Sequence, residues 1–230
     1  MVKRGQITLV IVLCIVILFS VVFYWGAYNK ISSIQTTPID TGSISSCTEK
    51  ILANILSDLA FQGGYLTIDE KYSTIWGDVP IYTLNKNVPT EDELKTEFEL
   101  EAASKLLVCI TPNMKKQEGD IIVESEFNNN QVRAVVNYPV SIAKGAYEQQ
   151  LSPVPVKINS RILVLQKAAD SIIKAVGDNL MQVPTVTILD IEEKDNLLID
   201  ALWDQENILY FISDKDKISQ PLVWVFAVRK

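Results

Sequence analysis

The feature that most constrains this chain is an uncharged, strongly apolar stretch near its beginning, Ile7 to Trp25. A helix rises 1.5 Å per residue, so a helix over this stretch would be about 29 Å long, close to the roughly 30 Å apolar core of a bilayer. Lys3 and Arg4 precede it. Because positive charge favours the cytoplasmic side, we predict one transmembrane helix with the N-terminus in the cytoplasm and the C-terminal domain extracellular.

A cleaved secretory signal peptide is the alternative interpretation of the same stretch. Such a peptide has a shorter apolar core, followed by small residues in an A-x-A-like cleavage site. In this chain the apolar core is long, and the bulky Tyr28 follows Gly26-Ala27. The pattern therefore favours a helix that stays in the membrane as an anchor.

The residues Lys3-Arg4-Gly5-Gln6-Ile7-Thr8-Leu9 resemble the class III signal peptide of archaeal type IV pilin-like, membrane-anchored surface proteins. In that family a prepilin-type peptidase cuts on the cytoplasmic side, ahead of the apolar helix. The resemblance implies cleavage between Gly5 and Gln6, which would release residues 1–5 as a leader. The helix over residues 6–28 would then anchor the chain, or join copies of it into a homo-oligomer such as a filament core.

A second, looser resemblance covers parts of the remaining chain. Phe61-Gln62-Gly63-Gly64-Tyr65 and Asn137-Tyr138-Pro139-Val140 are similar to segments of uncharacterised single-pass proteins of small-genome archaea. This likeness implies a place at the membrane and no particular activity.

The pilin-like N-terminal stretch differs from bacterial pilins at one position, because those pilins have a Glu where this chain has Val10.

Composition excludes several classes of function. The chain has 230 residues, a net charge of −7 and no His. The acidic balance does not fit nucleic-acid binding, or binding of anionic lipid by charge. Without His, the commonest general base and metal ligand is missing. We therefore expect no metal, no cofactor and no nucleic-acid partner.

The three cysteines suggest one disulfide bond. Cys14 lies inside the apolar stretch, whereas Cys47 and Cys109 lie in the part predicted to be outside the cell. Disulfides persist there, so we predict a Cys47–Cys109 bond, with two free thiols as the alternative. In the chain-entropy model such a bond would stabilise the fold by about 4 kcal/mol.

Periodicity predicts an α+β fold: an N-terminal transmembrane helix, then a mixed extracellular domain of three amphipathic helices and antiparallel β-hairpins. Residues 29–44 are expected to be a linker. A helical subdomain would cover residues 45–113 and an α+β subdomain residues 118–230, or one domain would cover 45–230. The predicted helices are Ser46–Phe61, Thr90 to near Cys109, and Ser160–Met181.

The β pattern comprises one isolated strand, two hairpins and three C-terminal runs. They are Tyr65–Asp69; Ile121–Phe127 with Gln131–Tyr138; Val140–Lys144 with Gln149–Ile158; and Thr185–Ile191, Ile208–Ser213 and Leu222–Val228. Pro153 and Pro155 predict that their strand lies at a sheet edge. The unbroken apolar run at the C-terminus predicts a strand buried on both faces. Trp76 is expected to pin a loop to the core, with an exposed surface loop as the alternative.

Clusters of carboxylates are the only candidates for catalysis. A pair of them could serve glycoside hydrolysis, and a cluster could bind Ca²⁺. We interpret them as solvated surface charge, and the protein as no enzyme. The clusters are Glu91-Asp92-Glu93, Glu97/Glu99/Glu101, Asp190/Glu192/Glu193/Asp195 (expected in a loop) and Asp214/Asp216.

These features together predict a non-enzymatic cell-surface protein with a membrane anchor. Its role would be that of a type IV pilin-like filament or adhesion subunit, with the membrane and a prepilin-type peptidase as partners. One alternative is an accessory or assembly factor of a secretion or motility machine. Another is an envelope hydrolase that acts through Asp and Glu.

Overall fold

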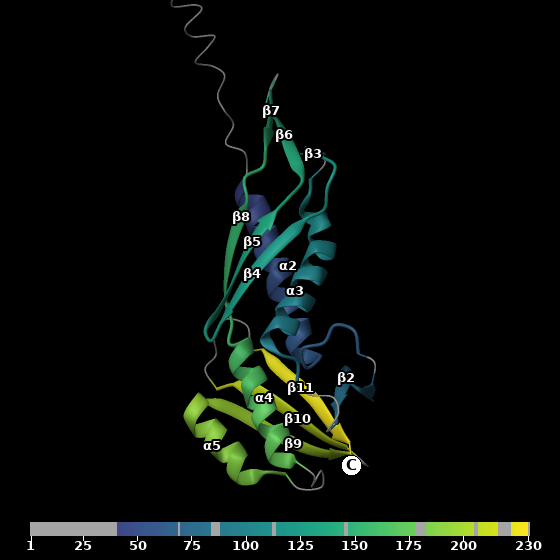
Figure 1. Cartoon of the computed structure of the whole chain (residues 1–230), viewed down its shortest axis with the longest axis vertical. Coiled ribbons are helices and arrows are strands. Elements are labelled where there is room, and N and C mark those ends of the chain that lie inside the picture. The colour runs from purple at the N-terminus through teal and green to yellow at the C-terminus, as the bar shows by residue number, and fades with distance from the viewer. Residues whose placement is uncertain are drawn as a thin grey trace, which may run out of the picture. The chain divides into compact units, whose positions relative to one another are not determined.

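The computed structural model describes residues 41–68, 70–83, 88–111, 114–144, 147–177, 183–204, 207–215 and 222–229 (Figure 1). The chain divides into residues 1–40 and Thr41–Lys230, and the described residues belong to the second unit. The predicted cleavage site at Gly5 and Gln6 and the predicted helix Ile7 to Trp25 lie outside the described residues. Within those residues, no helix is long and apolar enough to cross a membrane.

The described residues form a mixed α+β structure, as predicted. The helices are α2 (Thr41–Phe61), α3 (Glu91–Lys105) continued by the 3-10 turn η1 (Leu106–Cys109), α4 (Ile162–Val176) and α5 (Thr185–Asp195). Helix α3 begins at a capping box, in which Thr90 and Glu93 satisfy each other's backbone N–H groups. Helix α2 begins at Thr41, inside the predicted linker, and α4 ends at Val176, earlier than predicted.

A five-stranded sheet holds the C-terminal strands. Its strands, in order across the sheet, are β1 (Lys71–Thr74), β2 (Gly77–Tyr82), β11 (Val223–Arg229), β10 (Asn207–Asp214) and β9 (Leu197–Asp204). Strands β2 and β11 are parallel, and the other neighbours are antiparallel. Trp224 and Phe226 of β11 enter the main core on the inner face, and Val225 and Ala227 join a second apolar cluster on the outer face. The predicted burial of this strand on both faces is confirmed.

Two three-stranded sheets use the middle of the chain. One has the order β4 (Ile122–Asn128), β5 (Gln131–Asn137), β8 (Val154–Asn159), and the other β3 (Met114–Lys116), β6 (Val140–Lys144), β7 (Tyr147–Gln150). The predicted hairpin around the three asparagines is confirmed, because Asn128 pairs with Gln131 across a two-residue turn. Strand β8 lies at a sheet edge, as its prolines predicted.

Helix α2 connects the sheets. It packs against α3, β8 and β11, and Figure 1 shows the five-stranded sheet at its C-terminal end. Leu52, Ile55 and Leu59, which share its inner face, are fully buried. One apolar cluster therefore extends from Ile44 in the first turns of α2 to Val228 in β11.

Helix α5 corrects a predicted strand. Thr185–Ile191 contains several β-branched residues and was expected to be extended, but it forms the first turns of α5. Ile188 and Ile191 are buried three residues apart, while Val186 and Leu189 are exposed, which is helical spacing. Packing of that one face outweighs the local β preference.

Two further predictions about strands are wrong. Tyr65–Asp69 is not a strand in its described residues, and the region after it instead forms the β1–β2 hairpin. Gln149–Ile158 is not one strand, because β7 pairs with β6 whereas β8 pairs with β5. Strand β9, which no prediction covered, pairs with β10 along its full length.

The predicted end of the first helix at Phe61 is confirmed, and the Gly63-Gly64 turn that follows it is closely packed. Both residues have positive φ, and the Gly64 N–H donates to the Leu59 carbonyl at 2.7 Å. The Tyr82 hydroxyl donates to the Gly63 carbonyl. A Cβ at Gly64 would lie 2.4 Å from Pro89 Cγ and 2.7 Å from the Trp224 ring. Only glycine fits both the backbone and the space at this contact.

We predict that Gly64→Ala lowers the free energy of unfolding by about 4 kcal/mol, because it combines backbone strain with overlap against the core. Gly177→Ala is the control, since Gly177 also has positive φ but its Cβ would be 3.7 Å from the nearest atom. We expect a loss of about 1–2 kcal/mol there. Urea unfolding measures both, and equal losses would contradict the packing described.

Candidate functional site

The first carboxylate cluster belongs to the start of α3. The Thr90 N–H donates to Glu93 Oε2 at 2.7 Å, and the Glu93 N–H donates to Thr90 Oγ1 at 3.3 Å. Glu91 and Asp92 lie exposed in the same first turn. Acidic residues at this position stabilise a helix through its dipole, so the cluster has a structural role.

Two glutamates from the next clusters cap edge strands. The Ser125 N–H of edge strand β4 donates to Glu99 Oε1 of α3 at 2.7 Å, and the Ser125 hydroxyl donates to the same atom at 2.8 Å. The Ile199 N–H of edge strand β9 donates to Glu192 Oε1 at 2.9 Å. The cluster containing Glu192 lies on helix α5, not in the predicted loop. Each glutamate satisfies a backbone donor that an edge would otherwise offer to another strand.

Asp214 takes part in a partly buried ion pair. It accepts from Arg161, which directly precedes α4, and Arg161 Nη2 also donates to the Asp195 carbonyl at 2.6 Å. This contact joins the start of α4 to the end of β10. Asp216, the other member of the predicted pair, lies outside the described residues. Among the described residues, no three His, Cys, Asp or Glu side chains lie close enough to hold a metal ion.

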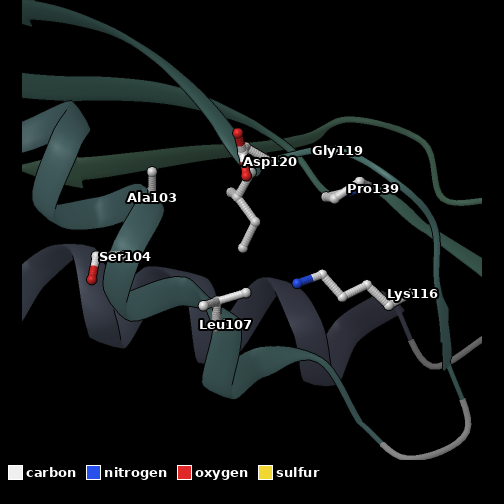
Figure 2. Close-up of a pocket in the computed structure, with 8 residues that line it drawn as sticks. Ala103, Ser104, Leu107, Lys116, Gly119, Asp120 and Pro139 are labelled. Carbon is white, nitrogen blue, oxygen red and sulfur yellow. The ribbon is translucent and has the colours of Figure 1, made fainter.

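Two shallow cavities lie away from the five-stranded sheet. The first, of about 280 Å³, lies between α3 and the segment after β3, and Figure 2 shows the Lys116 amino group pointing toward Leu107 in it. The second, of about 370 Å³, lies beside Glu49 of α2. Asp120 and Glu49 are the single carboxylates of the two linings. Neither cavity therefore holds the carboxylate pair that glycoside hydrolysis needs.

An apolar surface lies on the outer face of the five-stranded sheet. We call it the apolar patch; it consists of Ile75, Trp76, Leu198, Leu202 and Phe211. Ile75 and Trp76 form the turn of the β1–β2 hairpin and are 91% and 57% exposed, and Leu198 and Leu202 are about half exposed. The Trp76 ring meets the Phe211 ring edge-on, with centroids 5.7 Å apart. Asp200, which pairs with Phe211, lies between the two leucines on the same face. Exposed apolar side chains gathered on one sheet face are typical of protein-interaction surfaces.

Polar contacts hold the hairpin over this face. The Tyr72 hydroxyl of β1 donates to Asp204 of β9, at the opposite edge of the sheet, and this bond raises the pKa of Tyr72. Lys71 and Ser73 both donate to Asp78, at 2.6 and 2.7 Å, and the lysine holds the pKa of Asp78 below its usual value. The hairpin turn is thus fixed by its polar residues, while Trp76 stays open to solvent.

Trp76 therefore corrects the prediction of a loop pinned to the core. The sequence signal for the turn was Trp76-Gly77-Asp78, and Gly77 indeed has positive φ. Nothing in the sequence placed Leu198 and Leu202 on the same sheet face as Phe211, because β9 was not predicted.

At the other end of α2, Cys47 and Cys109 are joined with their sulfurs 2.08 Å apart and their Cα atoms 5.8 Å apart, as expected for the predicted pair. Beside them, the buried Thr48 hydroxyl donates to the Ile44 carbonyl and lies 2.7 Å from the Tyr138 hydroxyl. These bonds tie the beginning of α2 to η1 and to the end of β5.

Comparison with protein-family models, with curated proteins and with solved structures finds no match for this chain.

We predict that Trp76→Ala lowers the free energy of unfolding by about 1 kcal/mol, because the ring loses its contact with Phe211 but little burial. Trp224→Ala, at a fully buried tryptophan, serves as the control. It should cost about 3–5 kcal/mol. If the two losses were equal in chemical denaturation, Trp76 would be a core residue after all.

We predict that the wild-type chain, without reductant, migrates faster on a denaturing gel than after reduction, and that Cys47→Ser abolishes the difference. The substitution should also lower the free energy of unfolding by about 4 kcal/mol. Cys14→Ser is the control and should leave both properties unchanged. Equal mobility of the wild type with and without reductant would show that the bond does not form.

Proposed function

We propose that the protein is a non-enzymatic, membrane-anchored cell-surface protein whose outer domain, Thr41–Lys230, binds other macromolecules. The observation that carries this proposal is the Cys47–Cys109 pair at bonding distance. Disulfides persist in oxidising compartments outside the cytoplasm. The basic residues before Ile7 independently favour an orientation with this same domain outside. The disulfide bond and the charge pattern before Ile7 thus both support a location of Thr41–Lys230 outside the cytoplasm.

The surface of the domain supports binding more than catalysis. Glu93, Glu99, Glu192 and Asp214 are engaged in helix capping, edge capping and an ion pair. The apolar patch, in contrast, is exposed, and hydrogen bonds hold the hairpin that carries Trp76. An envelope hydrolase would need carboxylates that face a common substrate, so the described residues favour an interaction role.

The pilin-like beginning of the chain specifies this role further. After cleavage between Gly5 and Gln6 by a prepilin-type peptidase, the helix from Ile7 to Trp25 would either pack with copies of itself in an adhesive filament or anchor a solitary domain. The domain begins at Thr41, so residues 26–40 separate it from the apolar stretch. A segment of that length spans at most about 50 Å and lets the domain reach partners beside the membrane.

The apolar patch also favours a second candidate, an accessory factor of a secretion or motility machine. Such a factor binds other subunits through a permanent protein surface. Co-purification of the full chain with a membrane ATPase or platform protein, lost in Leu202→Asp and kept in the exposed control Leu189→Asp, would favour this candidate over adhesion.

We predict that the mature protein begins at Gln6, as measured by mass spectrometry of the N-terminal peptide from isolated membranes. Gly5→Val should block cleavage and leave Met1 or Val2 at the N-terminus, because the bulky side chain replaces the glycine that precedes the predicted cut.

An intact N-terminus in the wild type would exclude the pilin route and leave a plain anchor. A start after Ala27 would show a cleaved signal peptide and overturn the anchor itself. If the chain starts at Gln6, electron microscopy of cells with and without the protein then distinguishes a filament subunit from a solitary one.

A further inference from the structure

The beginning of α2 lies in the half of the domain that holds β3, β6 and β7, away from the five-stranded sheet (Figure 1). Cys47 follows Thr41 by less than two helical turns, about 9 Å along the axis. Because Cys109 is bonded to Cys47, η1 is held beside the point where the chain leads back to the apolar stretch Ile7 to Trp25. We call this region, with Leu107, Val108 and Lys116, the tethered end.

The tethered end exposes two adjacent apolar side chains. Val108 is 76% exposed and Leu107 is 47% exposed, although both belong to the short η1 turn fixed by the disulfide. Figure 2 shows the Lys116 amino group pointing toward Leu107. Among the described residues Lys116 makes no ion pair, whereas the neighbouring Lys115 pairs with Glu148 at 2.7 Å. An unpaired amino group beside exposed apolar side chains matches the chemistry of a lipid headgroup region.

We propose that the tethered end rests on the lipid bilayer, with Val108 and Leu107 among the headgroups and the Lys116 amino group against lipid phosphates. This inference rests on the proposed anchor. The net charge of −7 opposes adsorption of a free domain, so the contact depends on the anchor. Residues 26–40 keep the domain within about 50 Å of the membrane, and this raises its effective concentration at the surface enough for weak contacts to form.

The remainder of the fold agrees with this orientation. Helix α2 is about 30 Å long, and the five-stranded sheet lies at its C-terminal end, where Phe61 packs against the apolar cluster on the outer face of the sheet. With the tethered end on the membrane, the apolar patch around Trp76 faces away from it. The surface proposed for partner binding would then be the one most accessible to another cell or subunit.

The test uses the full chain in vesicles of phosphatidylcholine and phosphatidylglycerol, with a photoreactive diazirine amino acid at one position at a time. Position 108 is the test. Position 186 is the matched control, because Val186 is 83% exposed but lies on α5. Position 100 lies at an intermediate distance from the proposed contact. Leu100 of α3 precedes Leu107 of η1 by about two helical turns, or about 10 Å. After illumination, mass spectrometry measures the lipid adducts.

We expect the lipid adduct yield to be several-fold higher at position 108 than at 186, with position 100 between them. Lys116→Ala should lower the yield at position 108, whereas Lys115→Ala, which removes a lysine already paired with Glu148, should leave it unchanged. Equal yields at 108 and 186 would overturn the proposed contact.

Flotation separates this inference from the proposed function. If the chain floats with the vesicles while positions 108 and 186 give equal yields, the anchor stands and the resting contact is wrong. If the chain does not float, the anchor is wrong, and the proposed contact fails with it.

Discussion

The contact between the Gly63-Gly64 turn and the five-stranded sheet is the constraint on which the described domain depends. Helix α2 packs against the β4–β5–β8 sheet along its length, and its end must then meet a second sheet directly. It does so where Gly63 lies against Tyr82 and Gly64 lies against Trp224. Both contacts are so close that a Cβ atom on either glycine would overlap the neighbouring side chain. The stacked rings of Tyr82, Phe226 and Tyr210 continue this contact into the core. Burial there raises the pKa of Tyr210 to about 12, so the stack is uncharged at neutral pH.

The acidic residues illustrate how charge can serve a fold without serving catalysis. Glu99 and Glu192 come from different helices, yet each accepts a backbone N–H from the edge strand next to it. An edge strand with unsatisfied donors invites pairing with another chain. At these two positions the carboxylates therefore oppose pairing of the edge with another strand.

The two ends of α2 differ in chemistry. The beginning carries the disulfide and the exposed residues Leu107 and Val108, and the end supports the hairpin with Trp76.

Local sequence determined the end of α2, the start of α3, the asparagine hairpin and the edge position of β8, because capping, turn and proline chemistry act within a few residues. The apolar stretch before Trp25 predicts an anchor for the same reason. The pairing of Cys47 with Cys109 followed from their being the two cysteines outside the apolar stretch. Tertiary structure alone decided that Thr185–Ile191 is helical, that β9 exists, that Glu192 caps it, and that Trp76 lies beside Phe211 in an open patch. Those outcomes depend on which surfaces meet in space, and residues 135 positions apart, such as Trp76 and Phe211, carry no local signal of their contact.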